Sequence, residues 1–484
     1  MKKCVLGLDV GTTCTKAVVV DEFGQVLSQS SHGYGLITDG KKIEQRAEDW
    51  VDAVRSAIRA AVKGQKEIEV AAISLSTQGG STVAVDETGS CIGSAWTWMD
   101  GRCGAEVRFL NETLGADYIY KTTGWDTSPA LDAAKLLRMK TMPEYQNAKK
   151  YLTTLEIVNR YLTGLDAIDP SNAAMRQLYN VEQNRWDDRL LKTVGITEDV
   201  LPPVLPTGAP IGGLTAQAAA ETGLAEGTPV FNGAHDQYCA SIGAGAVHDG
   251  DMLLSAGTTW VLMGISSTPL FTESFIAPGK HPVDGLYGAI ASLVGSGAAL
   301  QWFKNNFLPG EFDEMNRTVA RRKEKARDLM FFPYQAGAEY PFWNADVKGA
   351  FTGIGLEHDR FDFARAIMEG VAFGVRRAVE DFRQHGTEIR SITVMGGAAK
   401  SDVWIQMIAD ITGVPIIRLN QGEVCALGAA VIAAKSIGLY ESYEEAARAM
   451  VHPETVFSPG DTAWYEEKFR NFDRMWNCLR QYYL

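Results

Sequence analysis

The tripeptide Gly-Thr-Thr occurs twice in this chain, each time directly after an apolar, β-branched run that predicts a strand. The first copy lies in VLGLDVGTTCTKAVVVDEFG and begins at Gly11, and the second lies in MLLSAGTTWVLMG and begins at Gly257. The two copies are about half the chain apart. A strand that ends in the same turn in each half indicates two domains, each with its own copy of one ligand-binding element.

A Gly-Thr-Thr turn can serve as an anion site. Glycine can adopt positive φ, and without a Cβ it lets a ligand approach the backbone. The amides that follow can converge on one point, and hydroxyl donors come from Thr12, Thr13, Thr258 and Thr259. One such turn alone is typical of an ordinary hairpin, but two that face each other across a cleft would hold a polyphosphate from both domains. Neither copy matches the Gly-x-x-x-x-Gly-Lys-Ser/Thr loop, so ordinary P-loop chemistry is not indicated.

Chain length and element order predict two α/β domains. The 484 residues are too many for one hydrophobic core. Strand patterns alternate with helical ones, such as those over residues 47–64 and 361–386, and this alternation is typical of α/β folds. The boundary falls near residue 247, before the second half begins with its own strand and turn. The predicted domains are residues 1–247 and 248–484.

Composition excludes several classes of partner. The net charge is −13, and the short basic run at residues 320–327 is typical of a solvated helix face, so nucleic acid is not expected. No apolar run approaches the roughly 18 residues of a membrane span. The seven cysteines are scattered without a Cys-x-x-Cys pair, which disfavours disulfides and zinc and favours a reducing cytoplasm. We therefore expect a cytoplasmic protein with no membrane partner.

Two aspartates are candidates for chemistry. Asp9 stands two residues before Gly11, and a carboxylate beside a bound polyphosphate implies Mg²⁺, reached through water; the alternative is a carboxylate that accepts hydrogen bonds from the turn amides. Asp236 follows a strand in GTPVFNGAHDQYCASIGAGA. It can orient a hydroxyl and accept its proton, or it can cap the following helix. The neighbouring His235 is expected to pack or support the site rather than act as the base.

A third glycine cluster stands in VMGGAAKSDVW, where Gly396 and Gly397 follow a predicted strand. Small residues there would let the backbone flank a flat aromatic ring and a ribose. The alternative is a tight strand-to-helix turn.

Together these segments resemble the FGGY carbohydrate kinases, a branch of the actin-like and hexokinase-like ATPase superfamily, and within it the xylulokinases. The motifs occur in family order along essentially the whole chain: GLDVGTTCTKAVVVD, AWTWMDGRC, AIDPSNAA, GAHDQYCASIGAG, SAGTTW, GSGAALQWF, GGAAKSDVWIQMIADITG and EVCALGAA. The resemblance implies an α/β fold of two ribonuclease-H-like domains that flank a deep cleft, with ATP and a sugar between them. It suggests a homodimer, for which the sequence shows no interface signature.

The resemblance also assigns roles to residues. The ATP phosphates are assigned to Gly11, Thr12, Thr13, Lys16, Gly257, Thr258 and Thr259. The rest of the nucleotide is assigned to Gly297, Gln301, Gly396, Gly397 and Ser401. The sugar is assigned to Gln78, Gly79, Trp98, Asp100, Asp236 and Gln237. Asp236 is the catalytic base in this assignment, and Asp9 holds Mg²⁺ through water.

The sugar pocket departs from the family pattern. Glycerol kinases have Gln-Arg-Glu-Thr and xylulokinases typically Gln-Met-His-Gly where this chain has Gln78-Gly79-Gly80-Ser81. The two glycines make room for a bulkier substrate, or for one held by other residues. Tyr340 replaces an arginine of a family loop, so any charge contact made there is lost.

The sequence thus predicts an ATP-dependent sugar kinase, with a ketopentose such as D-xylulose as the first substrate candidate. Other ketoses, polyols, sugar acids and autoinducer-type molecules are alternatives within the family. An ATPase without sugar transfer, or a silent sugar-binding or regulatory protein, is the alternative from another class. The presence of Asp9, both Gly-Thr-Thr turns and Asp236 favours an active kinase.

Overall fold

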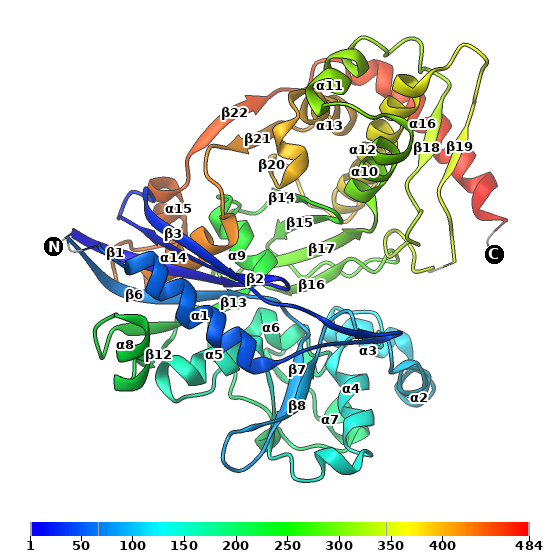
Figure 1. Ribbon diagram of the computed structural model, residues 1–484. Helices are drawn as coiled ribbons and strands as arrows, with labels where there is room; N and C mark the ends of the chain where they lie inside the picture. Colours follow the sequence, from blue (N-terminus) through cyan, green and yellow to red (C-terminus); the bar gives the residue numbers. More distant parts are fainter. Residues whose placement is uncertain (1, 66, 345, 483–484) are drawn as a thin grey trace.

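The computed structural model describes residues 2–65, 67–344 and 346–482. The chain forms two lobes, each built around its own β-sheet (Figure 1). The blue-to-green N-terminal half forms the lower lobe, and the green-to-red C-terminal half forms most of the upper one.

The N-terminal sheet has six strands in the order β12-β13-β6-β1-β2-β3. Its strands are β1 (Lys2–Val10), β2 (Cys14–Val20), β3 (Val26–Gly33), β6 (Ile68–Thr77), β12 (Pro210–Gly213) and β13 (Pro229–His235). The first three strands form an antiparallel meander, whereas β6 and β13 run parallel to β1. The near-continuous apolar sequence of β1 follows from its central position, where both faces of the sheet are covered.

The C-terminal sheet repeats this topology within seven strands of order β16-β17-β15-β14-β20-β21-β22. Its strands are β14 (Asp251–Ala256), β15 (Trp260–Ser266), β16 (Ala277–Lys280), β17 (Tyr287–Leu293), β20 (Ser391–Met395), β21 (Ile416–Leu419) and β22 (Pro453–Phe457). Strands β14, β15 and β17 are antiparallel neighbours, and β20 and β21 run parallel to β14. Five strands therefore match β1, β2, β3, β6 and β13 in order and direction, which confirms the predicted α/β fold of two related domains.

Helices cover both sheets. The helix predicted at 47–64 is α1 (Ala47–Val62), which packs its apolar face on β2 and β3. The helix predicted at 361–386 is α12 (Arg360–Gln384), which begins with a capping box of Asp359 and Asp362. The upper lobe also contains α10 (Ser296–Phe307), α13 (Asp402–Thr412) and α16 (Thr462–Arg480). No helix in the described ranges is long and apolar enough to cross a membrane.

The lower lobe carries an additional layer below its main sheet. A five-stranded sheet of order β4-β5-β8-β7-β9 packs with short helices around a core of its own. The strands are β4 (Ile37–Asp39), β5 (Lys42–Gln45), β7 (Thr82–Val85), β8 (Cys91–Trp96) and β9 (Lys150–Thr153). Two of these short helices are α4 (Asp132–Met139) and α6 (Pro170–Ala174).

Two glycine-containing helices join the lobes. Helix α14 (Val424–Ser436), from the C-terminal half, packs on β1 and on α9 (Asp236–Gly243). A Cβ on Gly7 would lie 1.9 Å from the carbonyl oxygen of Ala426, and a Cβ on Gly428 would lie 1.8 Å from that of Cys239. One apolar core accordingly spans both halves. The domain boundary near residue 247 stays a prediction: it falls between α9 and β14, but α14 crosses back to the N-terminal sheet.

Candidate active site

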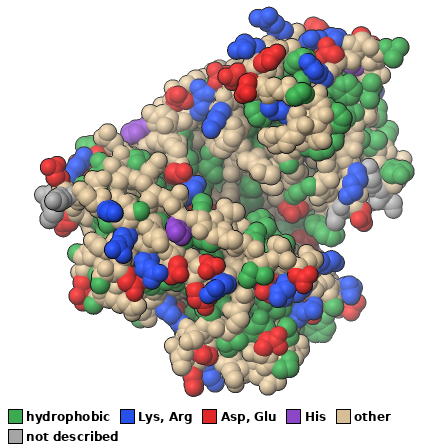
Figure 2. All heavy atoms as spheres, viewed as in Figure 1, with side chains coloured by type: hydrophobic (Ala, Val, Ile, Leu, Met, Phe, Trp, Pro, Cys, Tyr) green, Lys and Arg blue, Asp and Glu red, His purple; other side chains and the backbone are tan. Residues whose placement is uncertain are grey.

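Three adjacent parallel strands of the N-terminal sheet end at one edge. Val10 of β1 is the register partner of Thr77 in β6, and Thr77 is the partner of His235 in β13. The residues that follow these strand ends are Gly11, Gln78 and Asp236. The first Gly-Thr-Thr turn, the predicted sugar segment and the predicted base therefore leave the sheet side by side, at the edge where α/β sheets bind ligands. In the space-filling view the surface is hollowed between the two lobes (Figure 2).

The first Gly-Thr-Thr turn is held by side chains from three other segments. The carbonyl of Gly11 accepts a hydrogen bond from the hydroxyl of Tyr34 at 2.5 Å, and that of Thr12 accepts one from Nε2 of Gln45 at 2.6 Å. Nε1 of Trp98 donates to Oγ1 of Thr12 at 3.0 Å. The amides of residues 12 and 13 donate to no group in the described chain, which fits the proposed anion site.

The second turn is backed by glycines. A Cβ on Gly297 would lie 1.9 Å from the carbonyl oxygen of Gly257, and a Cβ on Gly396 would lie 2.7 Å from that of Ala256. Residues 257–259 and both glycines of the pair 396–397 are exposed. The structure thus brings Gly297 and Gly396 against the backbone of this turn, which only residues without a Cβ at those two positions permit.

The two turn glycines do not use the positive φ that glycine can adopt. Neither Gly11 nor Gly257 has positive φ, and a Cβ there would lie 3.5 Å and 3.8 Å from the nearest protein atoms. Positive φ occurs instead at Gly80, with φ of 65°, and at Gly396, with φ of 93°. Any need for glycine at positions 11 and 257 therefore comes from the ligand side.

Asp9 lies at the end of β1, directly opposite Lys16 of β2. Its Oδ1 accepts a hydrogen bond from Ser76 at 2.8 Å. Burial, together with repulsion from Asp236, raises the pKa of Asp9 to about 7. A cation beside Asp9 would relieve that repulsion. The described residues contain no cluster of three or more metal-ligating side chains, but Mg²⁺ bound with nucleotide phosphates needs only one or two carboxylates, so Asp9 fits the predicted role.

Lys16, predicted at the ATP phosphates, forms an ion pair in this structure. Its Nζ lies 2.5 Å from Oε2 of Glu423, and each side chain is about one-third exposed. Glu423 precedes helix α14 and has φ of 50°, which is unusual for a residue other than glycine. The pair therefore joins the two halves at the cleft, and a phosphate contact by Lys16 would require it to leave Glu423.

Asp236 is the first residue of α9 and is partly exposed, as is Gln237. The carboxylate does not cap the helix in this structure, so the helix-cap alternative receives no support. The buried ring of His235 lies beside it, with Nε2 at 3.3 Å from Oδ1 of Asp236.

The predicted sugar segment is closely surrounded. A Cβ on Gly79 would lie 2.6 Å from Cδ2 of His235 and 2.9 Å from Cγ of Met175, and a Cβ on Gly80 would lie 3.3 Å from Cβ of Trp98. The space left by the two glycines is therefore partly filled by protein. Trp98 is 44% exposed, as expected of a side chain that offers its face to a ligand.

Lys135 of α4 fixes the backbone of this segment from behind. The side chain is fully buried, and its Nζ donates to the carbonyl of Gly80 at 2.5 Å and to that of Trp96 at 3.0 Å. Burial lowers its pKa to about 8. The lysine is thus committed to the protein backbone.

Asp100, predicted to bind sugar hydroxyls, lies in a different environment. It is fully buried, and its carboxylate accepts hydrogen bonds from the amide of Ile43 at 2.9 Å and from Nη2 of Arg102 at 2.6 Å. The Arg102 guanidinium also lies 3.7 Å over the ring of Trp96. These contacts give Asp100 a structural use of its own, and its assignment to the sugar stays a prediction.

The two other residues predicted at the nucleotide, Gln301 and Ser401, have side chains that make hydrogen bonds within the protein. Gln301 is exposed on α10, and its Nε2 donates to Asn305 at 2.7 Å. Ser401 caps α13, where its hydroxyl accepts a hydrogen bond from the amide of Trp404 at 3.2 Å. Neither contact tests the predicted roles, but Ser401 has a structural use independent of any nucleotide.

Several buried polar atoms near the strand ends have no hydrogen-bond partner among the described residues. They are Oε1 of Gln78, Nδ1 of His235, Oε1 of Gln237 and Oγ of Ser81. Unpaired buried polar atoms are costly. A polyhydroxylated ligand carries both donors and acceptors and suits such a set.

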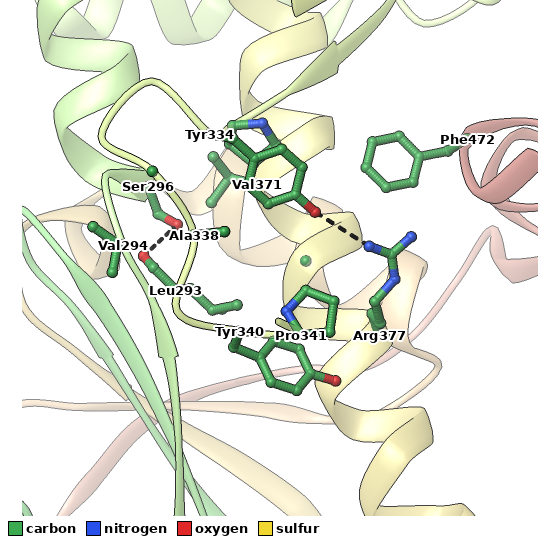
Figure 3. A pocket seen from close by; sticks show the side chains of 13 residues that line it. Leu293, Val294, Ser296, Tyr334, Ala338, Tyr340, Pro341, Val371, Arg377 and Phe472 are labelled. Atoms are coloured by element: carbon green, nitrogen blue, oxygen red, sulfur yellow. Dashed lines mark hydrogen bonds between the residues drawn. The ribbon is translucent and has the colours of Figure 1, made fainter. Parts of the chain in front are cut away.

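Two cavities lie outside this region. The first has a volume of about 20 Å³ inside the upper lobe, room for about one water molecule. In Figure 3, Tyr334 and Tyr340 line it beside Arg377, whose Nη1 donates to Tyr334 at 3.2 Å. Tyr340, the replacement for a family arginine, is thus a wall residue of a cavity too small for a sugar. The second, of about 310 Å³, lies at the junction of the lobes near residues 244–251.

Family models for the N-terminal and C-terminal domains of FGGY carbohydrate kinases match residues 4–243 and 252–437. The chain belongs to the FGGY family of carbohydrate kinases. The prediction of an ATP-dependent sugar kinase is thereby confirmed.

Individual relatives of this kinase cover nearly its whole length. Xylulose kinase of Bacillus subtilis (strain 168) is 30% identical over 94% of this chain and 93% of its own. The crystal structure of gluconate kinase from Lactobacillus acidophilus superposes with a TM-score of 0.94 at 26% identity, covering 99% of this chain and 98% of its own. The ligand-bound xylulose kinase from the same organism gives a TM-score of 0.93 at 26% identity, with the same coverage.

Sequence reasoning missed four residues at the site. They are Gln45, Lys135, Met175 and Glu423. Each contacts a predicted site residue or its backbone, but comes from a segment distant in sequence. Only Glu423 carried a signal, because it lies inside the motif EVCALGAA.

Proposed function

We propose that this kinase transfers the γ-phosphoryl group of ATP to a hydroxyl of a neutral ketopentose, with D-xylulose first, and that Asp236 is the general base. The observation that carries the catalytic part is the common edge at which Gly11, Gln78 and Asp236 follow three neighbouring strands. An anion site, a sugar segment and a carboxylate within one edge suit in-line transfer between two bound molecules.

In the proposed reaction, the sugar hydroxyl oxygen forms a bond to the γ-phosphorus while the bond from that phosphorus to the β,γ-bridging oxygen breaks. The hydroxyl proton passes to the carboxylate of Asp236, and ADP leaves with the bridging oxygen. Residues 11–13 and 257–259, with Lys16, bind the phosphates, and Gly297, Gly396 and Gly397 admit the adenosine. Mg²⁺, bound with ATP near Asp9, supplies neutralisation of phosphate charge.

The charge of the pocket supports a neutral substrate. Two cationic residues adjoin the glycine segment: Lys135 contacts Gly80, and Arg176 follows Met175, which lies beside Gly79. Lys135 is bound to two carbonyls, and Nε of the fully buried Arg176 donates to Asp132 at 2.6 Å. Both cations are thus paired with protein oxygens, and a substrate carboxylate would be repelled by Asp236. Gln78, Gln237 and Trp98 instead offer amide groups and an aromatic face, which suit hydroxyls and C–H groups.

The test is ADP release with Mg·ATP in the presence of D-xylulose, L-xylulose, D-gluconate or glycerol. We expect kcat/KM for D-xylulose to exceed that for D-gluconate by at least about 10-fold, the equivalent of one repelling charge of roughly 1.4 kcal/mol. A preference for gluconate would contradict the neutral-substrate argument. Binding of sugar without any stimulated ADP release would instead support a silent scaffold. The homodimer and the cytoplasmic location stay predictions.

A further inference from the structure

The ring of His235 lies between the sugar segment and the proposed base. Its Nε2 is 3.3 Å from Oδ1 of Asp236, and its Cδ2 edge faces Gly79, where an added Cβ would come within 2.6 Å. The side chain is buried, with only 7% of the residue exposed. A ring held at this point has little freedom to turn away from the carboxylate.

Gly79 is required by this ring rather than by its own backbone. Its φ is not positive, so any residue could adopt its conformation. The obstacle is space: a Cβ would lie 2.6 Å from Cδ2 and 3.0 Å from Nε2 of His235. Gly80 differs, because its φ of 65° independently favours glycine. Position 79, where this chain departs from the family pattern, therefore has a residue small enough to leave room for the ring of His235.

The backbone that carries the ring is fixed from a third side. The amide of His235 donates to Oγ of Ser171 at 2.9 Å, and the hydroxyl of Ser171 donates to Asp169. Asp169 in turn caps helix α6, accepting a hydrogen bond from the amide of Ser171 at 2.8 Å. On its other side the ring contacts Tyr238 edge to face, with centroids 6.1 Å apart.

We propose that His235 is a positioning residue for Asp236, and that Gly79 is present to admit its ring. The proposal rests on Asp236 being the general base. In the proposed role, Nε2–H of His235, now 3.3 Å from Oδ1 of Asp236, would donate a hydrogen bond to that oxygen and leave Oδ2 to meet the sugar hydroxyl. The separation of 3.3 Å is long for a hydrogen bond, as catalytic hydrogen bonds often are before substrates bind.

Two amide replacements separate this role from a structural one. The side-chain nitrogen of glutamine reaches about as far as Nε2 of histidine, whereas that of asparagine reaches about as far as Nδ1. We expect H235N to lower kcat about 10- to 50-fold with KM for ATP and sugar changed less than about 3-fold, and H235Q to restore kcat to within about 3-fold of wild type. Equal losses in H235Q and H235N, wild-type kcat in H235N, or an effect confined to KM would overturn the proposal.

A matched control replaces a second buried histidine. The ring of His281 also packs on Tyr238, with centroids 6.1 Å apart, but its Nε2 is 2.8 Å from Oγ of Ser241 rather than beside Asp236. We expect H281Q and H281N to leave kcat within about 2-fold, whatever their effect on Tm. Should they lower kcat as much as H235N, the loss reflects replacement of any buried histidine and the proposal fails.

The steric part is tested by pairing G79A with H235A and measuring Tm. We expect G79A to lower Tm by several degrees in the wild-type background and by less than about 1 °C beside H235A. An equal loss of Tm in both backgrounds would contradict the proposal that Gly79 makes room for the ring of His235.

The variant D236N, assayed in parallel, separates a failure of the proposed general base from a failure of the proposed role of His235. If D236N keeps wild-type kcat, Asp236 is not the base and the proposed function fails; if D236N loses turnover while H235N keeps it, only the present proposal fails.

Discussion

The two Gly-Thr-Thr turns occupy equivalent positions in two sheets of the same topology, yet their surroundings differ. The first is held by Tyr34, Gln45 and Trp98 from neighbouring segments. The second is exposed, and it is backed by Gly297 and Gly396, which permit backbone to approach backbone. The first turn is thus held by side chains of its own lobe, and the second is open at the surface, which suits the proposed nucleotide site.

The strand pairs that carry the two turns, β1–β2 and β14–β15, also differ in charge at equivalent positions. In the first, Asp9 is the cross-strand partner of Lys16. In the second, the residue two places before the glycine is Ser255, and its partner is Val261. Each half therefore has one proposed phosphate turn, and only the first has a charged cross-strand pair next to it. This difference teaches that the halves share architecture but divide the chemistry.

The largest effect on this comparison should come from removing the negative charge of Asp9, which has no counterpart beside the second turn. We expect D9N to lower kcat/KM for ATP at least about 100-fold, because Asp9 is the proposed partner of Mg²⁺. The control S255A, at the matching position, should change it less than about 3-fold. Steady-state ADP release at varied ATP and Mg²⁺ measures both. Similar losses in D9N and S255A would contradict the claim that only the first turn has a carboxylate that acts with Mg²⁺.

The same variant has a pH-dependent effect on stability. Burial and Asp236 raise the pKa of Asp9 to about 7 in the folded protein, against roughly 3.9 in the unfolded chain. Between these values the folded state holds a proton that the unfolded state has released, so stability falls as pH rises toward 7. D9N without ligands should therefore have a higher Tm than wild type at pH 8 and an equal one near pH 4. A lower Tm of D9N than of wild type at pH 8 would contradict the claim that the ionised carboxylate of Asp9 destabilises the folded protein.

The second prediction tests whether the turn glycines serve the ligand. Ala fits the fold at both positions, because the nearest atoms to an added Cβ are 3.5 Å away for Gly11 and 3.8 Å away for Gly257. We expect G11A and G257A each to raise KM for ATP about 10-fold and to leave Tm within about 1 °C. A large fall in Tm would mean that the glycines are structural, and an unchanged KM would exclude close approach of the phosphates.

The third prediction concerns the link between sugar and phosphate sites. W98F keeps the aromatic face but loses the Nε1 donor to Thr12. We expect a 3- to 10-fold loss of kcat/KM for the sugar and a rise of about 3-fold in KM for ATP, because the turn loses one support. W343F, at a position 66% exposed in the other lobe, is the control. If W98F changes only the kinetic parameters for the sugar, the hydrogen bond from Trp98 to Thr12 does not affect ATP binding at the turn.

The smallest effect should follow from E423Q. The Lys16–Glu423 pair is partly exposed, so its contribution to stability is expected to be below about 1 kcal/mol. Freed from this partner, Lys16 should bind phosphate more readily, lowering KM for ATP by up to about 3-fold, with the difference reduced at high salt. An increase in KM would indicate that Glu423 holds Lys16 in its productive position.

Much of this fold could be predicted because local pattern and global position agree. The β-branched runs before Gly11 and Gly257 became central strands, and the long helical period became α12. Asp236 could be proposed as the base because the family resemblance assigned that role to it, whereas its position between a strand and a helix also allowed a helix cap.

The rest depended on long-range packing. Nothing near Gly79 in the sequence indicates that His235 and Met175 fill the space beside it. The burial of Asp100 under Arg102 was equally hidden, because a motif shows which residues occur together but not which carboxylate oxygens are already bound. The φ angles of the turn glycines could not be predicted, because close ligand approach and positive φ both favour glycine and the sequence does not distinguish them.

The central claim is that one edge of the N-terminal sheet unites the sugar with a carboxylate that takes its proton. The most direct test is sugar-stimulated ADP release by wild type and D236N, with ATP and D-xylulose saturating. General-base catalysis contributes roughly 10²- to 10⁴-fold, so the account predicts that D236N retains at most about 1% of the stimulated rate while still binding both substrates. Stimulated turnover in D236N at the wild-type rate would contradict it.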